Sequence, residues 1–467
     1  MAASKPVMTT TTAGDCRHVP ETHHFEVVPA GYIEGDVGIG QLRRAIPSHC
    51  FRPSTVRSMW FFLRDILFMV TPLAATIYLE RRIDNRLAKL ILRAGVYPFV
   101  VGIPATGFWV LGHEAGHGSF SQNRIVGDLF GFIAHSFLLS PFFSWRSTHA
   151  RHHVYANHLS KDHNYVPPQK HEYAELFQGK VDIHEATEDA PVVLLLRVIL
   201  QQVIGWPWYL LTNITAAPQA VVRPSKGWWS NSHFDPWGSL FRADEFWSIV
   251  ASDVGLMGMG YMIYRAAGLY GWWAVTWGYF LPLMWVNHYI GGWPGTDIQN
   301  STVVMLTFSP ESWTFLRGAL STVDRDPGFL LRHLMHHIVD LHVVHHLFPR
   351  IPHYHAQEAT DAIRPLLGKY YRQDSGPWYG ALYSNFRDCQ WVEPNPTATE
   401  KGRVPKVRLF ICRRLLADPI LPLSSRLILL VLSQRHLKDD ETTQGDEAGI
   451  FWYRPGRMPR PAMIMRS

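Results

Sequence analysis

The sequence predicts an all-α integral membrane protein with about four transmembrane helices in hairpins and a cytoplasmic helical cap. The first observation is composition: aromatic residues make up 13% of the chain and charged residues only 18%. Such a chain has more apolar surface than soluble domains usually bury, and tryptophan and tyrosine suit membrane interfaces. The second observation is a series of apolar runs close to the roughly 20 residues that a spanning helix needs. The third is a group of three histidine clusters with related spacings.

The N-terminal segment, residues 1–57, is expected on the cytoplasmic side. Its first fifty residues are polar and show no cleavable signal peptide, so we expect internal spans to insert the chain. Net charge is +6, and part of the excess lies just before or inside the first apolar run, at Arg43, Arg44, Arg52, Arg57 and Arg64. This flank fits a surface of anionic lipid, although a solvated basic segment explains it equally well.

Charge and cysteine usage exclude two classes of function. The basic residues border apolar spans and no nucleic-acid-binding motif accompanies them, so no nucleic acid partner is expected. The four cysteines are far apart and lack C-x-x-C spacing, which indicates a reducing compartment and no thiol chemistry. They are Cys16, Cys50, Cys389 and Cys412.

Two apolar runs, 59–79 and 91–111, are long enough to span a bilayer and are joined by a short polar connector. We expect a helical hairpin that leaves and returns to one side of the membrane. The sequence GHEAGH, residues 112–117, then lies at the returning end of the second helix.

Later apolar runs leave the number of crossings open. The run 125–143 contains Asp128 and His135, so a re-entrant or interfacial helix is preferred there. Three more runs follow at 191–214, 246–266 and 269–287. Arg197 and Asp253 weaken the first two, since a charge at mid-bilayer costs about 3 kcal/mol. Either one of these three runs is interfacial or 125–143 crosses, because the histidine clusters must otherwise lie on opposite sides.

The C-terminal extension, residues 396–467, is expected to be separate from the membrane domain. It contains a basic and apolar stretch, 409–437, that suits a membrane surface. A packed terminal helix explains the same stretch equally well.

Three histidine clusters, HEAGH at 113–117, HARHH at 149–153 and HVVHH at 342–346, form the candidate site. At about 3.6 residues per turn, the i,i+3 and i,i+4 spacings put the imidazoles of each cluster on one helix face. The first cluster alone matches the H-E-x-x-H zinc-protease pattern, with Glu114 as general base. Eight histidines are too many for one tetrahedral zinc, and imidazole alone does not identify the metal. A carboxylate-bridged di-iron bundle is disfavoured because no second E-x-x-H is suitably placed.

The clusters and their surroundings resemble the membrane-bound fatty acyl desaturases, which carry three histidine boxes. Further segments are similar to the delta-12 (omega-6) oleate desaturase branch. They are AIPSHCFRPSTVRS at 45–58, HEAGHGSFS at 113–121, SWRSTHARHH at 144–153, TVDRDPGFL at 322–330 and HHLFPRIPHYHAQEATDAI at 345–363. The resemblance covers roughly residues 40–395 and assigns 58–395 to a membrane desaturase domain.

The resemblance implies a centre of two non-haem irons. Its implied ligands are His113, His117, His149, His152, His153, His288, His342, His345 and His346. It also suggests that His336 and Asp340 orient iron-bound imidazoles, with packing on a helix surface as the alternative for these two. Glu114 becomes a structural carboxylate or one that supports the ligands.

The expected activity is O₂-dependent desaturation of a fatty acyl lipid or acyl-CoA, of the oleoyl to linoleoyl type. An unactivated methylene has no acidic proton, so oxidation at iron, and not general-base chemistry, has to remove hydrogen. The sequence has no HPGG haem signature or Gly-rich nucleotide motif, and the resemblance implies electrons from external cytochrome b5 and its reductase. It further implies a multi-pass protein of the endoplasmic reticulum membrane with its active site facing the cytoplasm. A homo-oligomer is compatible with the sequence.

Two alternatives remain. The same irons could support a hydroxylase, acetylenase or conjugase acting on an acyl or secondary-metabolite chain. More remotely, a membrane zinc metalloprotease could use H-E-x-x-H at 113–117, which leaves the other two clusters without a role.

Overall fold

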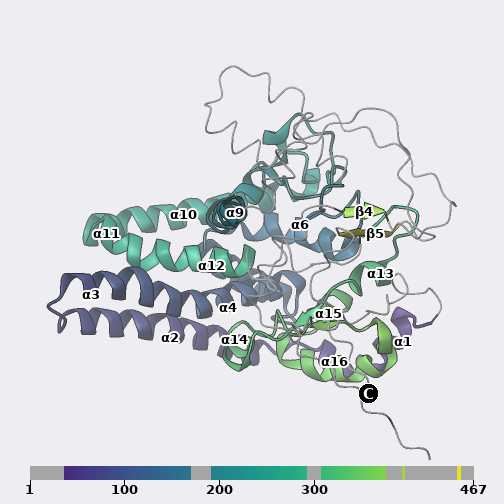
Figure 1. Cartoon of the computed structure of the whole chain (residues 1–467), viewed down its shortest axis with the longest axis horizontal. Helices are drawn as coiled ribbons and strands as arrows, with labels where there is room; N and C mark the ends of the chain where they lie inside the picture. The colour runs from purple at the N-terminus through teal and green to yellow at the C-terminus, as the bar shows by residue number, and fades with distance from the viewer. Residues whose placement is uncertain (1–35, 170–190, 292–306, 375–391, 395–449, 454–467) are drawn as a thin grey trace, which may run out of the picture.

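The computed structural model describes residues 36–169, 191–291, 307–374, 392–394 and 450–453. Long helices run side by side through one half of the molecule, and shorter helices form a cap at one end (Figure 1). In this part of the chain, three helices are long and apolar enough to cross a membrane: Thr55–Glu80, Arg86–His117 and Ala243–Tyr270. The predicted helical membrane fold is therefore confirmed.

The first hairpin consists of α2, Thr55–Glu80, and α4, Tyr97–His117. The short helix α3, Arg86–Ile91, and a π-helical segment, Leu92–Val96, lead into α4 without a break. Ser54 caps α2 by accepting a hydrogen bond from the Arg57 amide, so the helix begins where the basic segment ends. The predicted spans 59–79 and 91–111 both lie within these helices.

Helices α5, Arg124–Phe137, and α6, Phe142–Tyr155, meet at an angle of 107°. On α5, Gly131 and His135 lie on the buried face, whereas Leu129 and Ile133 are exposed. This one-sided pattern suits a helix at the rim of a membrane. The bend agrees with a re-entrant or interfacial segment over 125–143.

Helix α9, Pro191–Thr212, differs in direction from the other long helices. Figure 1 views it along its axis, whereas α2, α4 and α10, Phe246–Tyr270, run across the picture. The second hairpin is closed by a continuous helical run of α11, Trp272–Val275, a π-helical segment, Thr276–Phe280, and α12, Leu281–Gly291. Of the three later apolar runs, 191–214 is thus the one whose helix does not run parallel to the hairpins, although it packs against α12. Both hairpins return to the same end.

The cap surrounds that end. Its helices are α1, Ile39–Ala45, α13, Phe315–Ala319, α14, Phe329–Leu334, α15, His342–Leu347, and α16, His353–Leu367. Short 3-10 turns connect them or flank the hairpins, at Ser48–Phe51, Trp228–Asn231, Ala243–Glu245 and Gly368–Tyr370. A core of its own joins α1 to α15 and α16 through Leu42, Val344 and Ile363, all of which are buried. This core fixes the third histidine cluster over the returning ends of the hairpins.

Five short strands in the described part were not anticipated by an all-helical prediction. Strands β1, Thr307–Phe308, β5, Ile450–Tyr453, and β4, Val392–Pro394, form an antiparallel sheet in that spatial order. Strands β2, Asp324–Arg325, and β3, Gln373–Asp374, pair in parallel. They escaped prediction because two to four residues are too few to show an alternating pattern. Residues 450–453 of the C-terminal extension therefore pack against the rest of the chain, and the stretch 409–437 lies outside the described residues.

Candidate metal centre

The first histidine cluster lies on the last turns of α4. His113 and His117 are one turn apart and their Nε2 atoms are 3.2 Å from each other. The helix ends at Gly118, whose φ of 75° is left-handed and suits glycine. Gly112 permits close packing of α5, since a Cβ there would lie 2.3 Å from His135 Cδ2. Both glycines of GHEAGHG that flank the cluster thus have a structural purpose.

The second cluster, on α6, faces the first. His149 Nε2 lies 2.9 Å from His113 Nε2 and 3.0 Å from His153 Nε2. Trp145 stacks on the His149 ring with centroids 4.2 Å apart. The bend between α5 and α6 is what turns these imidazoles toward α4.

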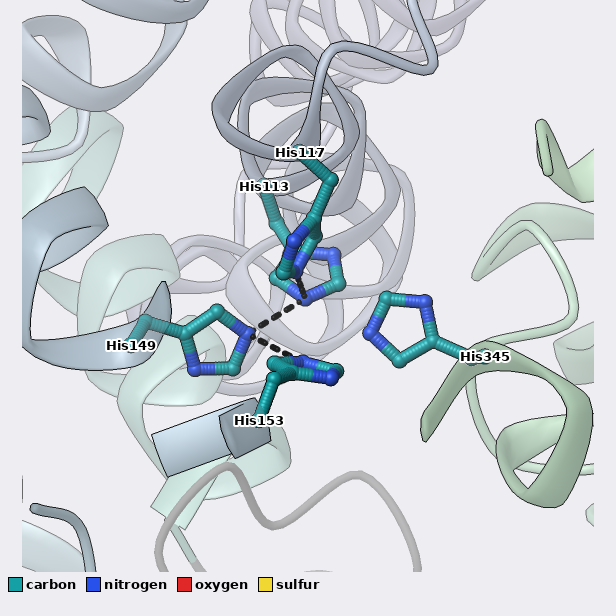
Figure 2. A group of neighbouring side chains, drawn as sticks. All are labelled: His113, His117, His149, His153 and His345. Atoms are coloured by element: carbon teal, nitrogen blue, oxygen red, sulfur yellow. Dashed lines mark hydrogen bonds between the residues drawn. The ribbon is translucent and has the colours of Figure 1, made fainter. Parts of the chain in front are cut away.

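The third cluster, on α15, approaches from the opposite side. His345 offers its ring to the four imidazoles of α4 and α6, and Figure 2 shows these side chains converging on one point. One ligand atom from each of five residues lies within 4.8 Å of all the others: His113, His117, His149, His153 and His345.

The remaining box histidines continue this group. The His346 ring stacks on His153 at 4.4 Å and lies 5.2 Å from His152. His342 Nε2 is 3.1 Å from His346 Nε2. All eight histidines of the three boxes therefore form one connected set of imidazoles.

The donor set fits a metal centre. The Nε2 atoms of His113, His117, His149 and His153 face one another, with distances of 2.9–3.2 Å along the chain of neighbours. Burial and the neighbouring histidines hold the pKa of His345 and His346 well below the ordinary value, and burial lowers the pKa of His342 to about 3. These imidazoles are therefore neutral at physiological pH, which is the form that binds metal. Buried neutral nitrogens facing one another are satisfied by cations better than by hydrogen bonds alone.

Asp162 supports the second cluster and was missed by the sequence analysis. Its Oδ1 accepts a hydrogen bond from His152 Nδ1 at 2.7 Å and another from the Asn164 amide at 2.9 Å. Its Oδ2 accepts from the Asn157 amide at 2.8 Å. The only signal in the sequence is a carboxylate ten residues after a box histidine, and many aspartates satisfy so loose a rule.

Asp324 supports the third cluster in a similar way. The carboxylate is buried and accepts from the Val343 amide at 2.7 Å, at the start of α15. The Tyr371 hydroxyl donates to its other oxygen at 2.5 Å. Burial raises the pKa of Asp324 to about 7. The segment TVDRDPGFL, residues 322–330, thus supplies a cap for the helix that bears the third box.

Glu114 is buried and joins α4 to α16. Its Oε1 accepts from the His353 amide at 2.7 Å and its Oε2 from His353 Nδ1 at 2.8 Å. Both oxygens are used in holding α16 against α4, which leaves Glu114 poorly placed to act as a protease base. This placement argues against the zinc-protease alternative, which requires Glu114 as the general base.

His336 and Asp340 make their hydrogen bonds away from the box imidazoles. His336 Nε2 lies 2.6 Å from Asp65 Oδ2, and its Nδ1 lies 3.3 Å from His353 Nε2. Asp340 accepts from His337 Nδ1 at 2.8 Å and pairs with Arg332 at 3.3 Å. His336 thus joins a buried chain from Asp65 to Glu114, and the orienting role for both residues stays a prediction.

His288 lies on α12, outside the group of five imidazoles. Its Nδ1 is 2.5 Å from Gln202 Oε1 on α9. A role as a ligand therefore stays a prediction for this residue, whereas the box histidines are already together.

Comparisons with known proteins agree with this site. Residues 91–378 match the family model described as fatty acid desaturase. An oleate hydroxylase from Claviceps purpurea is 37% identical over 388 residues, which is 79% of this chain and 80% of that protein. An omega-6 fatty acid desaturase, endoplasmic reticulum isozyme 1, from Glycine max is 36% identical and covers 78% of this chain and 88% of its own length. A delta(12)-fatty-acid desaturase from Arabidopsis thaliana is 36% identical, with 78% and 90% covered.

Proposed function

The chain belongs to the fatty acid desaturase family, and from this premise we propose that it desaturates an acyl chain at the delta-12 position, converting an oleoyl to a linoleoyl group. It is an oxidoreductase. The observation that carries the proposal is the union of all three histidine boxes in one buried set of imidazoles. Relatives named as delta-12 and omega-6 desaturases support the position of the double bond.

We propose that the eight box histidines hold two non-haem irons, with His288 as a further ligand. Two bound irons would supply the reduction of O₂ and the oxidising power that removes two hydrogens from adjacent methylenes. The protein's part is to hold the imidazoles neutral and fixed. Asp162 keeps a proton on His152 Nδ1 and so directs the Nε2 lone pair of that ring toward the centre.

Aromatic side chains contribute by keeping water from the histidines. Trp145 stacks on His149, and Trp109 stacks on His113 with ring centroids 5.9 Å apart. Both tryptophans are fully buried. A dry site protects a reactive centre from side reactions, and it suits an apolar substrate that enters from the bilayer.

We propose that the protein crosses the endoplasmic reticulum membrane several times, with 58–395 as the desaturase domain between segments 1–57 and 396–467. The two hairpins support this arrangement, because their tips lie at the end of the molecule opposite the cap (Figure 1). The histidine site then faces the cytoplasm, where cytochrome b5 and its reductase would deliver two electrons. The substrate is a fatty acyl lipid or acyl-CoA.

Expression in a yeast without polyunsaturated lipids tests this function. We expect gas chromatography of the total acyl chains to show linoleate in cells with the wild-type protein. Cells with a His345→Ala variant, expressed to an equal level, should show none, because one of the converging imidazoles is lost. Absence of any new acyl species from the wild-type cells would contradict delta-12 desaturation.

Hydroxylation is the second candidate, because the relative from Claviceps purpurea is named an oleate hydroxylase. Both reactions begin with removal of hydrogen from an unactivated methylene, so one histidine site serves either outcome. The same yeast cultures separate them: a hydroxylated oleoyl chain in place of linoleate favours the hydroxylase.

A further inference from the structure

A second group of metal-binding side chains lies in the cap, apart from the histidine boxes. His49 and Cys50 belong to the 3-10 turn Ser48–Phe51, and His355 and Glu358 belong to α16. One ligand atom from each of these four residues lies within 4.8 Å of the other three. The two pairs are far apart in sequence: the positions of His49 and Glu358 differ by 309.

The spacing of the ligand atoms is close to that around a tetrahedral ion. His49 Nε2 lies 2.9 Å from Glu358 Oε2 and 3.8 Å from Cys50 Sγ, and His355 Nδ1 lies 3.7 Å from Glu358 Oε2. Ligand atoms around tetrahedral zinc are roughly 3.3–3.6 Å apart, from metal–ligand bonds of about 2.0–2.3 Å. The observed distances lie on both sides of this value, so small side-chain movements would complete the geometry.

The backbone presents the four groups together. His355 and Glu358 are three residues apart on α16 and therefore share one face of the helix. The 3-10 turn is held over that face by the cap core, in which Cys50 is buried beside α16 and Phe51 packs edge-on against Phe348. The side chains of His49 and Glu358 are 56% and 47% exposed, which leaves an open path for an ion.

We propose that His49, Cys50, His355 and Glu358 bind one Zn²⁺ ion, which ties the N-terminal segment to helix α16. The choice of zinc over other metal ions follows from the ligand atoms. A thiolate, two imidazoles and a carboxylate in a closed set of four are typical of structural zinc, whereas magnesium and calcium prefer oxygen ligands alone.

Zinc binding at this cluster requires the Cys50 thiol to lose its proton. Burial and the neighbouring Glu358 raise the pKa of the Cys50 thiol to about 11, so without a metal the thiol keeps its proton. Zinc forms a bond to the sulfur and the thiol proton leaves to water. Burial, with Arg57 nearby, lowers the pKa of His355, so this imidazole is neutral and able to bind.

The alternative is that the cluster is an ordinary surface contact, in which the His49 and Glu358 pair is complete and Cys50 only packs. Exposed pairs of this kind contribute little to stability. The two possibilities differ in the response of the sulfur atom to a divalent ion, and only zinc binding requires all four side chains.

Cobalt titration of the purified full-length protein, loaded with iron beforehand, tests the proposal because Co²⁺ takes zinc sites and reports its ligands. We expect a near-ultraviolet thiolate-to-cobalt charge-transfer band that saturates at about one equivalent, and that added Zn²⁺ removes. The band should be absent from Cys50→Ser, which keeps the other three cysteines. The histidine boxes contain no sulfur and produce no such band.

Two further variants keep the test decisive if Cys50→Ser folds poorly. His355→Ala, at a partly exposed position, should weaken cobalt binding at least about tenfold, since one of four ligands is lost. Gln357→Ala, exposed on the same helix between the two ligands, is the matched control and should leave the band unchanged. A wild-type protein without the band, or an equal band in Cys50→Ser or His355→Ala, overturns the zinc site.

Discussion

At the scale of single residues, the centre depends on carboxylates that never touch the converging nitrogens. Asp162 has no exposed surface and accepts three hydrogen bonds, one of them from His152. Because imidazole has one proton when neutral, a carboxylate at Nδ1 decides that Nε2 has the free lone pair. The tautomer of His152 is thus set by a residue outside the boxes.

Replacing Asp162 with Asn should therefore weaken metal binding. The amide would place a donor among two backbone amides and an imidazole N–H, and the His152 ring would lose its fixed orientation. We expect a loss of metal affinity of roughly 10–100-fold. The measurement is iron retained by purified protein after challenge with a graded series of chelator.

Asp361→Asn is the matched control for that substitution, because Asp361 is exposed on α16 and its side chain accepts a hydrogen bond from Gln357 on the same helix. Its iron retention should equal that of wild type. Equal retention in Asp162→Asn would show that the carboxylate has no part in holding the ligand.

At the scale of elements, the packing of α4 relies on glycine where other helices cross it. A Cβ on Gly102 would lie 2.4 Å from Trp285 Cβ of α12, and one on Gly107 would lie 2.0 Å from the Leu334 carbonyl oxygen. These distances are shorter than any van der Waals contact. Close approach at these positions brings α12 and α14 against the helix that bears the first box.

Gly107→Ala should destabilise the protein, because the added methyl meets a backbone carbonyl that no rotamer change can move aside. Overpacking of this kind costs about 1–3 kcal/mol. Thermal unfolding in detergent, followed by circular dichroism, should show a lower midpoint than wild type.

Gly260→Ala offers the comparison within the same chain. Gly260 lies on α10, and a Cβ there meets nothing within 4 Å. Alanine in a helix is better than glycine by roughly 0.5–1 kcal/mol, so the midpoint should stay or rise. If both variants unfold at the same temperature, close packing at Gly107 is not what holds α4 and α14 together.

At the scale of the whole molecule, folding takes a large set of histidines out of water. His342, His345 and His346 are brought by the cap against two hairpins, and burial lowers the pKa of each. A histidine in the unfolded chain has a pKa of about 6.5. Between that value and the lower folded pKa, the unfolded chain binds more protons than the folded one.

Stability should consequently fall on acidification. It is complete above about pH 6.5 and decreases as the pH falls toward the folded pKa, by up to about 1.4 kcal/mol per pH unit for each such group. The iron content should also decrease as the pH falls, because imidazoles that bind metal must stay neutral. Unfolding midpoints and iron content measured from about pH 8 to about pH 5.5 check this.

Two variants test whether the buried histidines cause this pH dependence of the unfolding midpoint. His342→Gln should flatten the pH dependence, since it removes one buried imidazole, whereas His333→Gln changes an exposed residue and should not. A midpoint that is constant or rises as the pH falls would rule out the buried histidines as its source.

Local patterns in the sequence were enough to predict the helices of the bundle and all eight box histidines. Apolar run length and the i,i+3 and i,i+4 spacing are properties of one segment, and helix geometry converts them directly into spans and faces. The side chains that hold the boxes in place could not be predicted from such local patterns. His353, which holds Glu114, is 239 residues away from it, and no local rule connects the two.

The sequence by itself determined the class of protein and the positions of the three histidine clusters, because these depend on composition and short-range periodicity. The segments around the clusters carried the resemblance to the family. Only the tertiary structure decided that α9 lies across the bundle, that Asp162 and Asp324 support the boxes, and that His49 and Cys50 meet His355 and Glu358. Each of these depends on which distant segments share a core. Burial of apolar surface is non-directional, so an apolar segment does not specify which distant segment it packs against.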